Sequence, residues 1–371
     1  MRYIHEHADW PNLKWDTAKL LPLLADVRHR QGRLLGRMEG LGFQLRAEAS
    51  LTTLTDDVMK SSAIESVLLD VEQVRSSIAR RLGLDFGGTV QSSRDVDGVV
   101  EMMLDATQKY AEPVTAERLF AWHASLFPTG RNGLRRITVG AWRPATIGAM
   151  QVVSGPIGRE RVHFEAPAAD RLQHEVSVFL DWFEKANGVE PVIKAGIAHF
   201  WFVTIHPFED GNGRISRALA DLALARADGT KERFYSMSTQ IEAEKKQYYL
   251  NLERSQKGGM DITSWLEWFL GCLGRAIAGA ETGLERVLRK AKIWERIHNQ
   301  SPVNERQRKV INRLLDDFEG KLSTSKYAKL AKCSNDTALR DIKILLDGGI
   351  LVQDTGGGRN TSYHLAEPGA R

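Results

Sequence analysis

The strongest constraint on the fold is the twelve-residue stretch His206–Arg217, in which one proline and two glycines separate two apolar segments. Lys194–Ile205 precedes it and has the composition of a buried helix. Arg214–Ala227 is rich in alanine and leucine, as a second helix would be. Because Pro207 and the glycines cannot lie inside one continuous helix, the sequence predicts helix, loop, helix, with polar side chains gathered at the bend.

The composition of the bend indicates what it could bind. Gly211 and Gly213 can adopt positive φ and place no side chain between their N–H groups and a ligand. Those N–H groups open a helix, whose N-terminus carries roughly half a positive charge. Arg214 and Arg217 are three residues apart and therefore project from one helical face. Together these groups predict a polyphosphate site.

Two neighbouring side chains add chemistry to this site. Asp210 could hold Mg²⁺, which needs few protein ligands when phosphates supply the rest. His206 is the natural general base because its ordinary pKa lies near neutrality. The stretch is not a Walker A loop, which needs a Lys followed by Ser or Thr after a strand. The alternative interpretation of the same residues is a helix-capping turn with incidental charges.

The stretch resembles the signature of the Fic family, His-x-Phe-x-Asp/Glu-Gly-Asn-Gly-Arg-x-x-Arg, at every fixed position. This resemblance implies transfer of AMP from ATP to a hydroxyl group of a target protein. It implies that His206 deprotonates the attacking hydroxyl, Phe208 anchors the loop in the core and Asp210 coordinates Mg²⁺. The remaining positions would bind the triphosphate, with an anion hole at Gly211, Asn212 and Gly213 and phosphate contacts at Arg214 and Arg217.

The resemblance extends to an inhibitory helix of pattern Ser/Thr-x-x-x-Glu-Gly/Asn, which Ser61–Glu65 fits. It implies that Glu65 pairs with Arg217 in the place of the γ-phosphate and so autoinhibits the enzyme. Ser66 stands where Gly or Asn is usual, and Ser tolerates positive φ poorly. Read without the resemblance, Glu65 is a solvated charge at a helix end.

Local signals around this segment predict its boundaries. The threonines and aspartates of Thr52–Asp57 are helix-start signals, so we expect a short helix there, with Asp70 capping a further helix to about Leu82. Asp16 is predicted to cap a long helix before it, with Pro22 in its first turns.

A β-hairpin is predicted before the core helices. Its strands would be Met150, Gln151, Val152 and Val153 and then Arg161–Phe164, on either side of Ser154–Gly158. A surface loop is the alternative. Fic proteins carry a flap in this place, which implies that the target protein docks there as an added strand over His206.

Two aromatic features lie near the predicted site in sequence. Tyr248 and Tyr249 are most simply core or boundary residues. The segment also resembles the part of Fic proteins that lines the adenine pocket, so Tyr248 is a predicted nucleotide contact. His199 precedes His206 by seven residues, but a packed histidine is favoured over a metal ligand because no third ligand has suitable spacing.

The C-terminal segment resembles a winged helix. Helices are predicted at Ser323–Ala331 and Asp336–Leu346, followed by strands at Ile350–Val352 and Ser362–Leu365. The candidate DNA contacts are Ser334, Asn335, Thr337, Arg340 and Arg359. Residues 281–371 hold 17 Lys and Arg against 12 Asp and Glu, a surplus of +5 in a chain of net charge +4. This surplus is small for a DNA-binding module, and a protein-interaction module is the equal alternative.

The predicted architecture is mainly α. It comprises an N-terminal helical domain with the inhibitory helix (1–95), a Fic-type core (96–275), a connecting helix (276–300) and a winged-helix domain (301–371). Cys272 and Cys333 fall in different domains, which argues against a disulfide framework. Since the most apolar run, Ala195–Ile205, is too short to span a bilayer, we expect a cytoplasmic protein without a membrane partner. A homodimer is compatible with the sequence.

Three functions remain open at this point. The first is a protein adenylyltransferase, including one that modifies itself. The second is a DNA-binding transcriptional regulator whose Fic portion senses nucleotide. The third is a Fic enzyme that removes AMP or transfers another phosphate-containing group, with Glu65 positioning a water.

Overall fold

The computed structural model describes residues 2–84, 90–156, 158–300, 303–315, 318, 320–354 and 361–366. The chain divides into two compact units, Met1–Glu281 and Thr282–Arg371. The division falls within the helix α11, Thr263–Gln300, in the segment expected to connect the domains.

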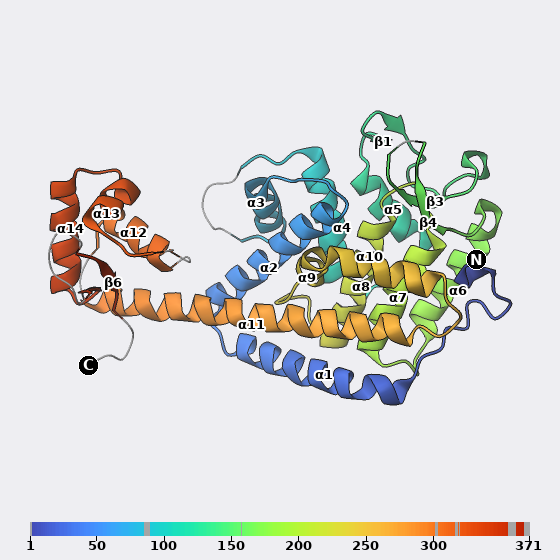
Figure 1. The fold of residues 1–371 in the computed structure, drawn as a ribbon, viewed down its shortest axis with the longest axis horizontal. Coiled ribbons are helices and arrows are strands. Elements are labelled where there is room, and N and C mark those ends of the chain that lie inside the picture. Colours follow the sequence, from blue (N-terminus) through green and yellow to red (C-terminus); the bar gives the residue numbers. More distant parts are fainter. Residues whose placement is uncertain are drawn as a thin grey trace. The chain divides into compact units, whose positions relative to one another are not determined.

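Two consecutive helices form the centre of the first unit (Figure 1). They are α7, Pro191–Ile205, and α8, Asn212–Asp228, which confirms the predicted helix, loop and helix. α7 begins at Pro191 because the Glu190 side chain accepts hydrogen bonds from the N–H groups of Val192 and Ile193. Nearly every residue of α7 is buried, which explains its continuous apolar composition.

Further helices surround this pair: α4 Arg94–Gln108, α5 Ala116–Leu126, α6 Leu172–Lys185, α9 Met237–Ala243, α10 Lys245–Gln256 and the first part of α11. The contact between α7 and α11 is close. A Cβ atom added at Gly196 would lie 2.9 Å from Cδ2 of Leu266, so α7 needs a glycine there. Within the described residues, no helix combines the length and apolar content needed to cross a bilayer.

The N-terminal segment confirms one predicted helix and corrects another. α1, Thr17–Glu39, is capped by Asp16, which accepts a hydrogen bond from the N–H of Lys19. The helix expected to start among Thr52–Asp57 is longer than predicted: α2 runs from Phe43 to Ile64. The threonines lie in its interior because buried leucines continue the helical stripe through them, and Thr55 Oγ1 donates to the carbonyl of Leu51. α3, Val71–Arg81, has the predicted Asp70 cap.

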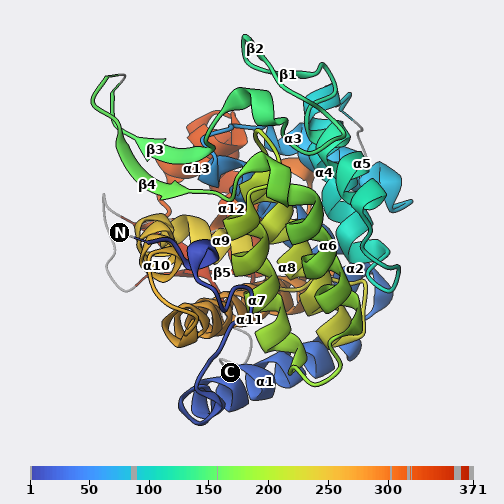
Figure 2. The ribbon, with the colours of Figure 1, turned by 90° about the vertical axis from the view of Figure 1, so that its right-hand side faces the viewer.

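Two short antiparallel hairpins lie at one end of the helical core (Figure 2). The first pairs β1, Arg131–Asn132, with β2, Arg135–Arg136. The second pairs β3, Gln151–Ser154, with β4, Arg161–Glu165, and so confirms the predicted hairpin. Its register shifts at this point of the ladder: Val152 pairs with Phe164 and Val153 with Val162, so β4 contains the extra residue, His163.

The second unit has a core of its own. Its elements are α12 Glu305–Leu315, α13 Thr324–Ala331, α14 Asn335–Asp347, β5 Leu351–Gln353 and β6 Tyr363–Leu365. β5 and β6 are antiparallel, and Leu322 forms a further bridge to Tyr363. Both predicted helices and both predicted strands are present within a residue or two. The predicted boundary at Ser301–Pro302 and the candidate wing residue Arg359 lie outside the described residues.

Candidate active site

His206 occupies the turn that ends α7. Its φ is +52°, and its N–H still donates to the carbonyl of Phe202 at 3.1 Å. Ring atom Nδ1 lies 3.1 Å from the carbonyl oxygen of Val203, which requires the proton on Nδ1. Burial lowers the pKa of His206 below its ordinary value. The imidazole is therefore neutral at physiological pH, with the lone pair of Nε2 available to accept a proton.

The loop after His206 is held by Phe208 and Asn212. Phe208 is fully buried, stacks on His123 at 4.2 Å between ring centroids and contacts Trp142. Asn212 Oδ1 accepts a hydrogen bond from the N–H of Phe208 at 3.0 Å, and its Nδ2 donates to the carbonyl of Phe208 at 2.8 Å. The Asn212 side chain thus fixes the loop, and only its backbone N–H faces the predicted anion hole.

Arg143 is a site residue that sequence reasoning missed. Its Nε donates to the carbonyl of His206 at 2.9 Å, its side chain also donates to the carbonyl of Pro167, and its N–H donates to the carbonyl of Pro207 at 2.9 Å. No carboxylate pairs with it in these bonds, and burial lowers the pKa of Arg143 to about 10. No motif surrounds Arg143 in the sequence, so nothing there signalled that it contacts the turn at His206.

The start of α8 holds the residues of the predicted anion site. Gly211 precedes the helix with φ +80° and has no side chain that could cap it. The first N–H groups of α8 therefore have no side-chain partner at this end of the helix. Arg214 and Arg217 are buried beside it, and the Arg214 guanidinium lies 5.1 Å from the centroid of the Phe127 ring. Arg214 Nε and one terminal nitrogen of Arg217 have no hydrogen-bond partner within the described structure. The two buried guanidinium groups thus keep N–H donors that a bound anion would be able to pair with.

α2 supplies a carboxylate to this site. Arg217 donates to Glu65 Oε1 at 2.9 Å, to Ser61 Oγ at 2.9 Å and to the Ser61 carbonyl at 2.8 Å. Although burial opposes it, the Glu65 charge raises the pKa of Arg217. A Cβ atom added at Gly213 would lie only 2.1 Å from Glu65 Oε1, so this carboxylate lies directly against the first turn of α8. The geometry brings together the predicted inhibitory pair.

The end of α2 is a Schellman motif with an unusual residue. The N–H of Ser66 donates to Ala63 O at 2.9 Å, and that of Val67 donates to Ser62 O at 3.0 Å. Ser66 has φ +62°, the conformation in which glycine is usual. A left-handed conformation costs a non-glycine residue about 1–2 kcal/mol. Glu65 is therefore presented from a strained turn.

Two acidic residues follow Phe208 with different partners. Glu209 is buried against the N–H of Thr138, at 2.9 Å, and pairs with Arg135 at 3.2 Å. The Asp210 carboxylate contacts the Asn132 amide and the N–H of Gly211. Among the described residues no three His, Cys, Asp or Glu side chains cluster as metal ligands. A single carboxylate fits Mg²⁺ that takes most ligands from phosphates and water.

The predicted flap is tied to the core by Glu253 on α10. Its carboxylate bonds His163 Nδ1 at 2.7 Å, Arg161 at 2.9 Å and Lys257 at 2.7 Å. Burial opposes ionisation, but these hydrogen bonds lower the pKa of Glu253 to about 2. Sequence reasoning missed this attachment because Glu253 is ninety residues away from His163. Of the described strands, only β4 pairs with β3, so the residues Gln151, Val152 and Val153 have a second edge, and Met150 leads into it.

The two tyrosines of α10 differ in environment. Tyr248 is 1% exposed, and its hydroxyl lies 2.9 Å from Nε2 of His199. This burial leaves no Tyr248 surface for a nucleotide in the present conformation. Tyr249 is 39% exposed, and its hydroxyl donates to the carbonyl of Ile64 at 3.4 Å. His199 packs against Trp265, and burial lowers its pKa to about 3, as expected of a core histidine.

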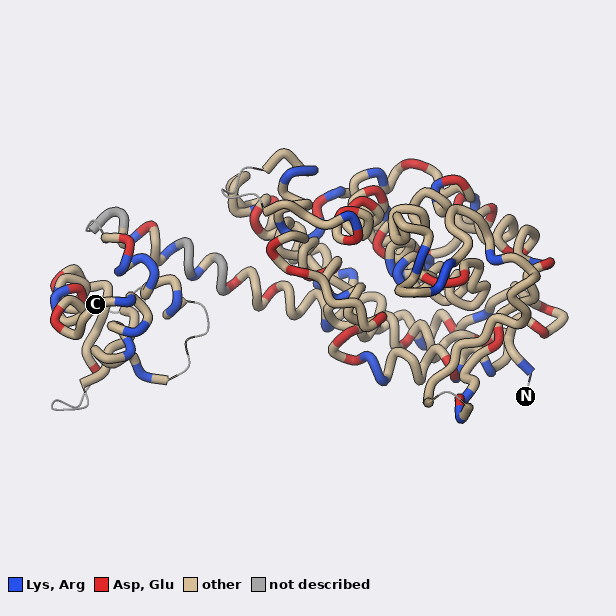
Figure 3. Tube along the Cα trace, turned by 90° about the horizontal axis from the view of Figure 1, so that it is seen from above, with Lys and Arg blue, Asp and Glu red and all other residues tan. Residues whose placement is uncertain are grey.

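The candidate DNA contacts lie at the start of α14. Ser334 caps the helix by accepting a hydrogen bond from the N–H of Thr337, and the two hydroxyl groups also contact each other. Asn335 and Arg340 are exposed. α14 contains three Asp against one Arg and one Lys, whereas α12 and α13 together hold six Lys and Arg against one Glu. Figure 3 shows acidic and basic residues interspersed in this unit. DNA binding stays a prediction. The charges of the three helices place a basic surface on α12 and α13 instead of on α14.

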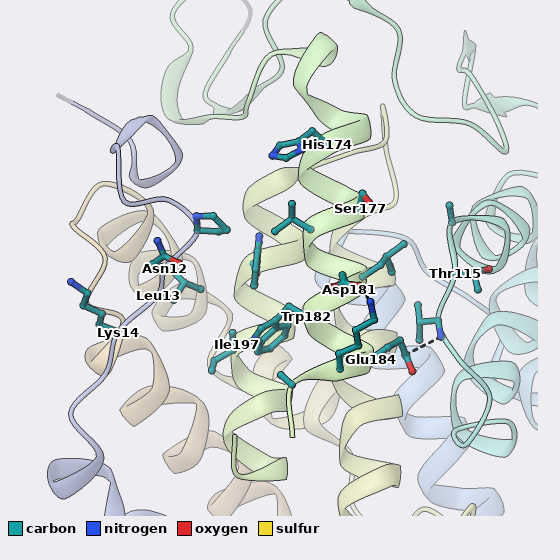
Figure 4. A pocket seen from close by; sticks show the side chains of 18 of the residues that line it. Asn12, Leu13, Lys14, Thr115, His174, Ser177, Asp181, Trp182, Glu184 and Ile197 are labelled. Atoms are coloured by element: carbon teal, nitrogen blue, oxygen red, sulfur yellow. Dashed lines mark hydrogen bonds and ion pairs between the residues drawn. The ribbon is translucent and has the colours of Figure 1, made fainter. Parts of the chain in front are cut away.

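A separate hollow of about 1210 Å³ lies on the first unit away from the bend (Figure 4). Its walls come from the N-terminal segment, the start of α5 and the helices α6 and α7, and include Asn12, Lys14, Thr115, His174 and Trp182. None of the predicted site residues lines this hollow.

Known proteins resemble two parts of the chain. Residues 113–224 match the Fic/DOC family, and residues 3–84 match a domain of unknown function, DUF4172. Among curated relatives, Protein adenylyltransferase Fic of Drosophila mojavensis is 25% identical over 225 residues, which cover 59% of this chain and 40% of the relative. The namesake of Nematostella vectensis is 30% identical over 113 residues, covering 30% of this chain and 25% of the relative. The chain thus spans well under half the length of these relatives.

Solved structures show the same fold. A Fic family protein from Desulfovibrio desulfuricans superposes with a TM-score of 0.54 at 23% identity, covering 94% of this chain and 98% of that one. A Fic domain containing signaling protein from Bacteroides thetaiotaomicron gives 0.50 at 17% identity, with 69% and 95% coverage. The matched residues 113–224 include the whole bend, and the chain therefore carries a Fic/DOC family domain.

Proposed function

We propose that this protein transfers AMP from ATP to the hydroxyl group of a Ser, Thr or Tyr side chain in a target protein. The observation that carries the proposal is the juxtaposition at the bend. A neutral His206 imidazole, an uncapped helix start and two buried guanidinium groups converge there. The names of the adenylyltransferase relatives support the same reaction at low identity.

The reaction assigns a role to each group. The target oxygen attacks the α-phosphorus of ATP while His206 Nε2 accepts its proton. The bond between the α-phosphorus and the oxygen bridging to the β-phosphate breaks, and pyrophosphate leaves. The N–H groups of Asn212 and Gly213 and the guanidinium groups of Arg214 and Arg217 stabilise the phosphate charge. Mg²⁺, bound by the phosphates and Asp210, would neutralise further charge on them.

Glu65 inhibits this reaction in the resting protein. Its carboxylate bonds Arg217 and occupies the space beside Gly213, where a terminal phosphate would lie. A charge-assisted hydrogen bond contributes about 1.5–3 kcal/mol. Removal of the carboxylate should therefore raise AMP transfer by about one to two orders of magnitude.

The target docks on the second edge of β3 as an added strand. Main-chain pairing recognises an extended segment without demanding a particular sequence. Arg143 connects this hairpin to the bend, since it donates both to the carbonyl of Pro167, two residues after β4, and to the carbonyl of His206. The residues that would take part are Met150, Gln151, Val152 and Val153.

The second unit is proposed to be a winged helix, from its order of helix, bridge, helix, turn, helix and hairpin. A mobility-shift assay with duplex DNA at two salt concentrations tests whether it binds DNA. A true binder loses affinity steeply as salt rises. No shift at low salt would leave the unit a protein-interaction module.

The test of the enzymatic proposal uses labelled ATP, a cell lysate and three proteins: wild type, Glu65→Gly and Glu65→Gly/His206→Ala. We expect label on discrete protein bands with the single variant, little with wild type, and none with the double variant. Labelling that persists in the double variant would refute the role of His206. If wild type instead strips label from premodified bands, the enzyme removes AMP.

A further inference from the structure

α2 contacts α8 through three pairs of residues with a regular spacing. Two pairs were described above: Glu65 against Gly213, and Ser61 against Arg217. Four residues further from the bend on each helix, Asp57 faces Asp221 in hydrogen-bonding contact. Residues four apart share one face of a helix, so the three pairs form one antiparallel seam.

The third pair joins two buried acids. Asp57 is 5% exposed and Asp221 is 1% exposed. Asp57 Oδ1 accepts hydrogen bonds from the Ser236 hydroxyl and from the N–H of Ser238. Asp221 Oδ1 accepts from Arg233 at 3.4 Å, whereas Oδ2 has no donor within the described structure. Two ionised carboxylates cannot lie in contact without strong repulsion, but one proton between them removes it and supplies the missing donor.

The surrounding charges do not remove the need for this proton. Arg233 faces Asp221 and also pairs with Asp228 at 3.0 Å, so it is shared between two acids. Arg217 lies one turn away on α8 and is paired with Glu65. On α2, the adjacent residue Asp56 adds a further acidic group; desolvation and the Asp57 charge raise the pKa of Asp56, and Lys60, one turn beyond it, lowers it. Burial and the Asp57 charge raise the pKa of Asp221 well above its ordinary value, against the opposing effect of Arg233 and Arg217.

We propose that Asp57 and Asp221 share one proton, and that this proton holds α2 in register on α8 so that Glu65 stays on Arg217. The pair consists of positioning residues, since neither touches the predicted nucleotide. The consequence for activity rests on the proposed function, whereas the shared proton does not.

The pH dependence has a definite sign. A carboxyl group with a raised pKa in the folded state binds its proton more tightly than in the unfolded chain. Its stabilisation is complete below the ordinary carboxyl pKa and is lost as the pH rises through the raised value. Alkaline conditions should therefore loosen the seam and weaken inhibition by Glu65.

Hydrogen exchange of the α2 amides measures the seam without nucleotide. In wild type, protection corrected for intrinsic exchange should fall as the pH rises above the ordinary carboxyl pKa of about 4, by about tenfold for each pKa unit of tighter proton binding in the folded state. In Asp57→Asn the amide donates to Asp221 without a titrating proton, so protection should be high and independent of pH. The matched control Glu48→Gln removes a carboxylate from the same helix that pairs with Arg75 instead, and it should keep the wild-type profile.

Two further measurements separate the possible failures. Infrared spectroscopy of wild type above the ordinary carboxyl pKa, where free carboxyl groups are ionised, should show a protonated carboxyl band that Asp57→Asn and Asp221→Asn both lack. AMP transfer by wild type should rise with pH relative to Glu65→Gly, and this relative rise should vanish in Asp57→Asn. Absence of the infrared band, or equal pH profiles of exchange in wild type and Asp57→Asn, would overturn the shared proton. If the band and the exchange behave as expected but Glu65→Gly transfers no AMP, only the proposed function fails.

Discussion

Replacement of Arg143 by lysine tests whether a buried cation positions the catalytic turn. Arginine reaches the carbonyl groups of His206 and Pro167 with separate nitrogens of one planar group. A lysine keeps the charge, but its single nitrogen cannot reproduce both bonds in that geometry. Loss of one hydrogen bond to a charged donor costs about 1.5–3 kcal/mol. For a unit of this size we expect the thermal midpoint to fall by about 3–5 °C.

The effect on catalysis should exceed the effect on stability. The carbonyl of His206 would lose its partner, and displacement of a catalytic group by about 1 Å can cost about a hundredfold in rate. The assay is AMP transfer in the Glu65→Gly background, so that inhibition does not mask the change, with thermal unfolding measured in parallel. Arg135→Lys is the matched control, because Arg135 is exposed and pairs with Glu209 beside the same loop. An Arg143→Lys protein with an unaltered midpoint and an unaltered rate would refute the positioning role.

Three other predictions follow from the site. Because burial lowers the pKa of His206, the rate of AMP transfer by Glu65→Gly should stay constant as the pH falls to 6.5 and decline only below it. A profile of rate against pH measures this, and a decline centred at or above pH 6.5 would contradict it. Asn212→Ala leaves the N–H and carbonyl of Phe208 buried without partners and should destabilise the protein by about 2–4 kcal/mol in denaturant unfolding. Glu253→Gln should speed hydrogen exchange in β4 and reduce target modification, while nucleotide binding is kept. Unchanged exchange in β4 would show that other contacts hold the hairpin.

The sequence predicted the features that depend on local signals. Pro207 and the glycines determined where α7 ends and α8 begins, because backbone restrictions act within a few residues. The hairpin at 151–165 followed from its glycine-rich turn. The resemblance to Fic proteins predicted that Glu65 pairs with Arg217, although more than 150 residues separate the two in sequence.

The missed features depend on packing between distant segments. Arg143 and Glu253 are single charged residues in unremarkable surroundings, and only the folded chain places them against His206 and His163. The start of α2 was misjudged because threonine and aspartate favour helix caps, yet a buried apolar stripe overrides that local preference. The sequence also could not show which of the two adjacent tyrosines is exposed. The packing buries Tyr248 and leaves Tyr249 partly exposed.

The missing side chain at Gly213 limits which mutations are expected to activate the protein. The same absent side chain makes room for the carboxylate in the resting protein and, by our proposal, for a phosphate during turnover. Under the proposed function, a side chain added there would collide with the Glu65 carboxylate and would also take room from the phosphate, so it is not expected to raise activity. Under the same proposal, loss of the carboxylate at Glu65 would empty the space beside Gly213 and leave Arg217 and the start of α8 intact, so that position is where a permanently active variant is expected.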